Sequence, residues 1–302
     1  MSLLPGIILR FAESRGVRAV LIKGQTLSDQ GLRPARQSGD VDIWVDPEQF
    51  DGFRRALAGW GWNDRDEKVL APLTGPASVF VVHSVTLMND EWPVSIDLHR
   101  CYPGFFTAPN ELFNHVWNAR EPNVIGHQLC AVPHPTDHWL LAMLHATRDR
   151  NSRQLEELER AANDFDTVRL QHVRDRALTL GAAEPLRQRL ARRGITFPPA
   201  DAESSRLLDE WRLAISPAAH GDLTHVNELL RARGKDRLAV IRKAIFPPET
   251  TYRLFHDVRP GKAGLLLSYA RRGLSGILAV PRMVRYAMTM RNPSRTNRSA
   301  AD

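Results

Sequence analysis

The segment GDVDIWV, residues 39–45, places two aspartates inside an otherwise apolar stretch. Side chains alternate along a strand, so Asp40 and Asp42 share one face while Val41 and Ile43 occupy the other. Two ionised carboxylates side by side repel each other, and a divalent cation bound between them removes that cost. The pattern therefore indicates either a metal-binding strand or two surface aspartates on the polar face of an edge strand.

A Lys-Gly pair upstream ends a second apolar segment. Residues 17–23 are β-branched and apolar, which predicts a buried strand that ends at Gly24, and residues 25–30 are expected to form a short helix. Free backbone N–H groups at such a strand-to-helix turn bind phosphate. A phosphate site is therefore expected near the carboxylates.

A third acidic residue comes from a predicted hairpin. Residues 78–88 and 92–100 alternate like two strands joined around an Asn-Asp turn, and the second strand puts Asp97 and His99 on one face. Two metal ions that clamp the oxygens of a phosphoryl displacement call for about three convergent carboxylates. Asp97 is thus the candidate to join Asp40 and Asp42.

Beyond residue 133 the strand patterns stop and helical patterns follow, so the expected fold is α+β, a small mixed sheet with flanking helices followed by a mainly helical part. Thr136 or Asp137 is expected to cap the first of these helices. The later helices are expected at 154–163, 167–180, 184–193 and 225–243. The expected domains are a core (1–133), a helical domain (134–250) and a basic C-terminal helix with a disordered tail (251–302).

Composition restricts the class of protein. The 302 residues are 43% hydrophobic and 25% charged, typical of a globular chain, and two cysteines fit a reducing cytoplasm. We expect neither a signal peptide nor a membrane span of ~20 apolar residues. The net charge of +7 belongs to residues 251–302, which carry ten Arg or Lys and two Asp. That segment either contacts an anionic membrane surface or RNA, or packs as a last helix with its arginines in solvent.

The ordered pieces LIKGQTL, Arg36-Gln37-Ser38, GDVDIWV and VSIDLHR resemble the LKG…R…DIDLLV pattern of an uncharacterised bacterial nucleotidyltransferase family. This family belongs to the DNA polymerase β-like superfamily, whose members include nucleotidyltransferase toxins. The resemblance implies a nucleotidyltransferase core that moves an NMP from an NTP, such as ATP, to an acceptor hydroxyl or phosphate. It implies Mg2+, with Mn2+ as an alternative, and leaves the acceptor open among a small molecule, a protein or peptide, and tRNA.

The family's acidic roles transfer to three positions. The resemblance implies that Asp40 and Asp42 hold both metals, and that Asp97 completes one metal site and helps to deprotonate the acceptor. His99 shares the face of Asp97, so it approaches the metal or is a hydrogen-bonded structural histidine. The site is expected to be catalytic as well as metal-binding.

The nucleotide is expected to contact the turn and the loop that follows it. The resemblance assigns this role to Lys23, Gly24, Gln25, Thr26, Arg36 and Ser38. Gly24 and the next two amides would cradle the triphosphate, and Lys23 or Arg36 would neutralise it. Gln25 departs from the second Gly or Ser of the wider superfamily, which affects the geometry of the triphosphate.

Further candidates lie on the helix that follows residue 135. His138, His145 and Asp149 fall on one helical face, and Arg148 is a candidate phosphate ligand. They either line a cleft between the domains and contact base, ribose or acceptor, with His99, His145 and Arg148 as its possible residues, or they pack as an ordinary polar face.

Two other functions compete with nucleotidyl transfer. A non-catalytic module would bind nucleotide or a partner without turnover, and the intact acidic trio argues against it. A metal-dependent phosphohydrolase would show an HD pair with histidine partners, and Asp137-His138 has the opposite order without them.

Overall fold

The computed structural model describes residues 3–36, 38–66, 70, 73, 81–215, 242, 249, 258 and 261–274. The chain divides into two compact units, Met1–Ile215 and Ser216–Asp302, so the expected boundary at 133/134 falls inside the first unit. In the second unit the described residues include a helix at 261–274. Apart from residue 242, the expected helix at 225–243 lies outside the described residues. No helix in the described part of the chain has both the length and the apolar character needed to cross a membrane.

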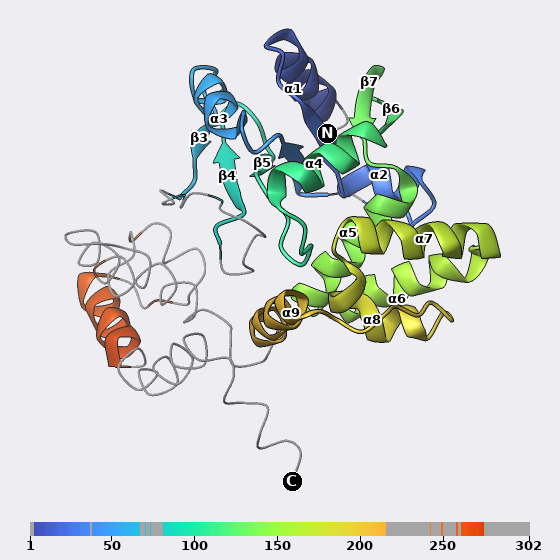
Figure 1. Cartoon of the computed structure of the whole chain (residues 1–302). Coiled ribbons are helices and arrows are strands. Elements are labelled where there is room, and N and C mark those ends of the chain that lie inside the picture. Colours follow the sequence, from blue (N-terminus) through green and yellow to red (C-terminus); the bar gives the residue numbers. More distant parts are fainter. Residues whose placement is uncertain are drawn as a thin grey trace. The chain divides into compact units, whose positions relative to one another are not determined.

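A five-stranded mixed sheet forms the centre of the first unit (Figure 1). Its strands are β1 (Ala19–Ile22), β2 (Asp40–Val45), β3 (Asn63–Asp64), β4 (Ser84–Met88) and β5 (Ser95–His99), in the order β1-β2-β5-β4-β3. Strands β2 and β5 pair in parallel, and the other pairs are antiparallel. The predicted α+β class, the strand before the Lys-Gly turn, the strand that carries Asp40 and Asp42, and the β4–β5 hairpin are confirmed.

A separate hairpin was not predicted from the sequence. Strands β6 (Glu121–Ile125) and β7 (Gln128–Val132) pair only with each other. Gly126 and His127 both have positive φ angles, 56° and 64°, as a two-residue hairpin turn of the I′ type requires. Pro122 lowers the strand propensity of β6, and it is tolerated because a two-stranded sheet consists of edge strands.

The described helices agree with the sequence pattern in most places. They are α1 (Leu3–Ser14), α2 (Gly24–Asp29), α3 (Phe50–Ala58), α4 (Pro109–Asn118), α5 (Pro135–Arg148), α6 (Ser152–Ala161), the 3-10 turn η1 (Ala162–Asp164), α7 (Thr167–Thr179), α8 (Ala183–Ala191) and α9 (Ala202–Ala214). Helices α5 to α8 gather into one group beside the sheet (Figure 1). Helices α4 and α9 were not anticipated.

Strand β2 is buried on both faces. Val41, Ile43 and Val45 pack in one hydrophobic cluster with residues of α1 and α3, while Trp44 belongs to a second cluster with much of α5. Asp42, on the same face as Trp44, is only 5% exposed. The alternative of two surface aspartates on an edge strand is therefore wrong for Asp42.

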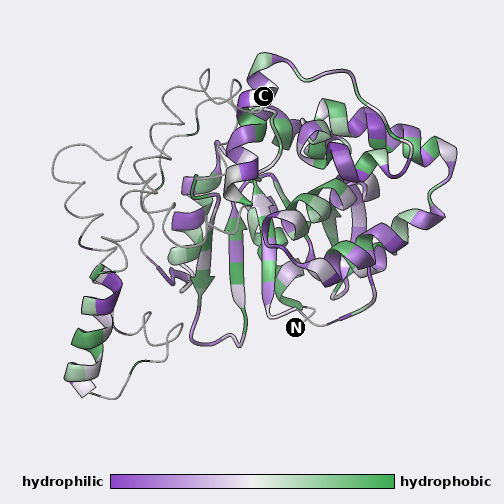
Figure 2. Cartoon of the chain, turned by 90° about the horizontal axis from the view of Figure 1, so that it is seen from below, coloured by the Kyte–Doolittle hydropathy of each residue, from purple (hydrophilic) through white to green (hydrophobic). Residues whose placement is uncertain are grey.

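Hydrophobic and hydrophilic bands alternate around the helical ribbons, as helices covering a core require (Figure 2).

The N-terminus of α5 differs from the expectation. His134, rather than Thr136 or Asp137, is the N-cap residue, and its Nδ1 accepts a hydrogen bond of 3.2 Å from the Thr136 amide. Asp137 instead accepts two hydrogen bonds of 2.6 Å from Arg176 on α7. Its side chain is 1% exposed, so this ion pair is buried between two helices.

We expect Arg176→Met to lower the free energy of unfolding by about 3–5 kcal/mol, because it leaves the Asp137 carboxylate buried without its partner. Arg212→Met is the matched control, since Arg212 pairs with Asp209 at 3.5 Å on an exposed surface and should change stability by less than about 1 kcal/mol. Chemical denaturation of both variants measures the difference. Equal losses would contradict the structural role of the buried pair.

Candidate functional site

Two carboxylates and one imidazole meet on one face of the sheet. The parallel register of β2 and β5 places Asp42 directly beside Asp97, and Trp44 beside His99. One potential ligand atom from each of Asp42, Asp97 and His99 lies within 4.8 Å of the other two. Within the described residues this is the group of three whose geometry suits a metal ion. The sequence had placed these residues on two strands without their register.

Asp42 is ionised although it is buried. Its Oδ1 accepts hydrogen bonds from Lys23 Nζ at 2.7 Å and from His99 Nε2 at 2.9 Å. Burial alone would raise the pKa of Asp42, but the His99 hydrogen bond and the Lys23 charge outweigh it and hold the pKa well below its usual range. The site therefore presents a fixed negative charge to a cation.

Asp97 and Asp40 are each oriented by a hydroxyl group. Thr86 Oγ1 on β4 donates to Asp97 Oδ1 at 2.7 Å, and Ser38 Oγ donates to Asp40 Oδ1 at 2.7 Å. Asp40 does not belong to the tight group around Asp97. The structure thus brings together two members of the predicted acidic trio and places the third two residues away along β2.

The Lys-Gly turn is conformationally strained. Lys23 has φ 59° and ψ −143°, and Gly24 also has a positive φ of 49°. A side chain in this region costs about 1–3 kcal/mol, so other contacts must hold it there. The amide N–H of Lys23 donates to His138 Nε2 at 2.7 Å, and Thr26 Oγ1 donates to the Lys23 carbonyl. Together with the Asp42 ion pair, these contacts fix the turn in place.

His138 joins the helical group to this turn. Because its Nε2 accepts from an amide, its Nδ1 carries the proton and donates to Gln30 Oε1 at 2.7 Å. The ring is fully buried, and burial together with the nearby Arg33 charge lowers its pKa to about 3. His138 is therefore a neutral structural support of the site.

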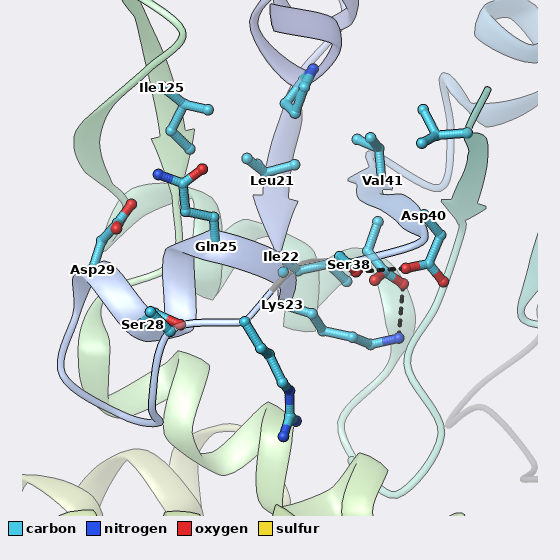
Figure 3. A pocket seen from close by; sticks show the side chains of 16 residues that line it. Leu21, Ile22, Lys23, Gln25, Ser28, Asp29, Ser38, Asp40, Val41 and Ile125 are labelled. Carbon is cyan, nitrogen blue, oxygen red and sulfur yellow. Dashed lines mark hydrogen bonds and ion pairs between the residues drawn. The ribbon is translucent and has the colours of Figure 1, made fainter. Parts of the chain in front are cut away.

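A pocket of about 540 Å3 opens at this end of β1 and β2 (Figure 3). Its polar part includes five of the six residues expected to bind nucleotide: Lys23, Gly24, Gln25, Arg36 and Ser38. Asp40 and Asp42 line it as well, and Lys23, labelled in Figure 3, donates a hydrogen bond to the Asp42 carboxylate. Thr26 is buried beneath the turn and does not line the pocket.

Two features of this pocket were not anticipated. Arg36 forms an ion pair of 2.9 Å with Glu157 on α6, so part of its charge is already balanced. The pocket also has an apolar part, which includes Pro5, Leu21, Val41, Val94 and Ile125. No motif indicated this part, because its residues come from five separate segments.

The remaining candidates on α5 lie apart from the pocket lining. His145 Nδ1 lies 2.9 Å from Asp149 Oδ2, and Arg148 contacts both Asp149 and His83 Nε2, the latter at 3.1 Å. The His83 ring in turn lies 6.0 Å from the His99 ring. These residues form a polar cluster behind His99.

Two further residues support the site and were missed in the sequence. Thr86 faces Asp97 in the β4–β5 register, and a correct alignment of the predicted hairpin would have found it. Arg33 donates to the Gly24 carbonyl at 2.5 Å, which braces the turn from the loop that follows α2. No local pattern marks that contact.

Comparison with known proteins identifies the family to which the chain belongs. A family model described as "Uncharacterised nucleotidyltransferase" matches residues 6–196, so the chain belongs to this family. No curated protein matches the chain significantly.

Two solved structures are similar at low identity. The antibiotic-resistance factor ANT(2'')-Ia has 11% identity and a TM-score of 0.39, over 64% of this chain and 97% of that one. An antigenic nucleotidyltransferase-like protein from Paracoccidioides brasiliensis has 10% identity and a TM-score of 0.34, over 66% and 94%.

The donor atoms fit a divalent cation. Ligand atoms around an octahedral dication at about 2.1 Å lie about 3 Å apart when adjacent and about 4.2 Å apart when opposite. The cluster, with its ligand atoms within 4.8 Å, is close to that geometry. The Lys23 ammonium, 2.7 Å from Asp42, places a positive charge beside the same carboxylate.

Because His138 is neutral when folded, we expect acid to destabilise the protein through this residue. Its pKa falls from 6.5 to about 3 on folding, so its contribution is fully present above pH 6.5. It is lost at about 1.4 kcal/mol per pH unit as the pH falls toward 3. His138→Gln keeps an acceptor and a donor without titrating. The free energy of unfolding of the wild type, measured relative to this variant, should therefore fall by about 2 kcal/mol between pH 7.5 and pH 5. A constant difference would show that His138 is not buried in neutral form.

Proposed function

We propose that this chain is a metal-dependent nucleotidyltransferase that moves an NMP from an NTP to an acceptor hydroxyl or phosphate. The observation that carries the proposal is the parallel pairing of Asp42 with Asp97, beside a pocket that also contains Lys23 and Gly24. Membership of a nucleotidyltransferase family supports the class of reaction.

In this proposal Asp42 and Asp97 hold a divalent cation such as Mg2+, and Asp40 provides a ligand for a second one. The metal ions supply Lewis-acid stabilisation of the charge on the phosphates. The protein positions these carboxylates beforehand: Thr86 orients Asp97 and Ser38 orients Asp40. A preorganised set of this kind lowers the cost of reorganisation during reaction.

The Lys-Gly turn would bind the triphosphate. Lys23 is paired with Asp42 in this structure, and its ammonium would transfer to a phosphate oxygen when a metal neutralises that carboxylate. Gly24 and Gln25 would contact the phosphates, and Ser38, which also lines the pocket, would assist, whereas the buried Thr26 would not reach them. Arg36 would contribute less than the sequence suggested, since Glu157 already pairs with it.

The reaction would proceed by in-line displacement. An acceptor oxygen attacks the α-phosphorus, the bond from that phosphorus to the bridging oxygen breaks, and pyrophosphate leaves. The acceptor proton passes to the Asp97 carboxylate, which is partly exposed and hydrogen-bonded to Thr86. The acceptor is a small molecule, a protein or peptide, or tRNA. The volume of the pocket, about 540 Å3, is that of a small-molecule site.

Label transfer tests this function. The purified chain is incubated with Mg2+ or Mn2+, each α-labelled NTP and a cell extract, and both labelled product and pyrophosphate are measured. Asp42→Asn should reduce transfer on the order of 100-fold or more, the scale of losing one group that stabilises transition-state charge. Chelation of the metal should abolish transfer. Asp51→Asn, on the exposed face of α3, is the matched control and should retain activity. Nucleotide binding without product or pyrophosphate would instead support a non-catalytic binding module.

A second variant tests the role of Thr86. Thr86→Val removes the hydroxyl that orients Asp97 but keeps a similar shape. Loss of a partner behind a metal ligand should reduce metal affinity or activity by about 10–100-fold. Thr107→Val is the matched control, because the Thr107 hydroxyl donates to the Thr179 carbonyl in an exposed contact. Equal activity of the two variants would count against an oriented Asp97.

A further inference from the structure

We infer that His99 is a nitrogen ligand of the metal held by Asp42 and Asp97, and that the site takes a divalent transition metal in preference to Mg2+. The inference rests on the proposed function only for the presence of a metal between the two carboxylates. It departs from that function in the identity of the third ligand and of the ion.

The geometry places the imidazole where a third ligand belongs. His99 follows Asp97 by two residues on β5, so both side chains leave the same face of the sheet. Its Nε2 lies 2.9 Å from Asp42 Oδ1, close to the separation of about 3 Å between adjacent ligand atoms of an octahedral ion. Asp40, the alternative third ligand, lies outside this group.

Packing holds the ring beside the carboxylates. His99 is 2% exposed, and its ring stacks on Tyr102 with centroids 5.7 Å apart and an interplanar angle of 29°. The His83 ring lies 6.0 Å away. This packing restricts rotation of the ring, whereas the long, flexible side chain of Lys23 can leave Asp42 when a metal binds. The imidazole therefore stays beside the bound ion.

An ion in this position favours the imidazole lone pair over an N–H group. In the described structure Nε2 donates to Asp42 Oδ1, and Nδ1 has no hydrogen-bond partner among the described residues. A cation bound to both carboxylates would lie on the Nε2 side, where an N–H dipole would repel it. A neutral histidine avoids this by carrying its proton on Nδ1, which leaves Nε2 free to coordinate.

The ligand set determines the preferred metal. Carboxylates suit Mg2+ and Mn2+ alike, whereas imidazole nitrogen suits the transition metals and binds Mg2+ poorly. A site with two carboxylates and one imidazole should therefore bind Mn2+ more tightly than Mg2+. Three carboxylates at the same place would produce a weaker preference.

Pulsed electron paramagnetic resonance of the full-length protein tests the inference without any substrate. The metal-free chain is loaded with Mn2+ alone, at less than one equivalent, and the spectrum is examined for modulation by a directly bound 14N nucleus. We expect this modulation in the wild type and in His83→Gln, which removes a neighbouring histidine. We expect it to disappear in His99→Gln, with about tenfold or greater weakening of Mn2+ binding.

Two further measurements make the result independent of the folding of His99→Gln. Labelling histidine with 15N in the wild type should replace the 14N modulation with that of 15N. Excess Mg2+ should displace Mn2+ only at much higher concentration. Mn2+ that binds in the wild type and is lost in Asp42→Asn, but shows no nitrogen coupling, would overturn the ligand assignment while leaving the proposed function intact. Failure of the wild type to bind Mn2+ or Mg2+ at all would overturn both.

Discussion

The ionised carboxylate of Asp42, buried in the central part of the sheet, is the constraint on which the rest of the site depends. An unpaired buried charge is strongly unfavourable, and here Lys23 and His99 both bind the same oxygen. The Lys23 contact also requires a backbone conformation that disfavours a side chain, which His138 supports from α5. The charge balance of Asp42, the geometry of the Lys-Gly turn and the packing of the helical group against it are thus coupled through Lys23, which contacts both Asp42 and His138.

This coupling explains why the site is built on rigid elements. Asp42 and Asp97 lie on paired central strands, the Asp97 carboxylate is held by Thr86, and β2 is buried on both faces. Lys23 is the exception, because in the proposed reaction its ammonium moves from Asp42 to a phosphate oxygen. A fixed set of carboxylate ligands, with Lys23 as the one positively charged side chain that can move, suits a reaction in which positive charge moves from carboxylates to phosphates.

Local patterns in the sequence predicted the individual strands and the turn of the site, but not the register in which the strands pair. The alternation around Asp40 and Asp97 and the Lys-Gly turn identified β1, α2, β2 and β5, because strand and turn preferences are short-range. The direct pairing of Asp42 with Asp97 depends on a parallel register between segments about 55 residues apart, which no local pattern determines. The contacts of His138 with Lys23 and of Arg36 with Glu157 are long-range for the same reason. The proposed role of these carboxylates in binding metal rests on the resemblance to a nucleotidyltransferase family, because the geometry alone would have left that role open.

A crystal structure of the chain with Mn2+ and a non-hydrolysable NTP analogue would locate both the metal ion and the Lys23 side chain. Anomalous scattering locates the metal without ambiguity. We expect Mn2+ between the Asp42 and Asp97 carboxylates, and Lys23 Nζ moved from Asp42 to a phosphate oxygen. Metal bound elsewhere, or a triphosphate bound while Lys23 remains on Asp42, would contradict this expectation.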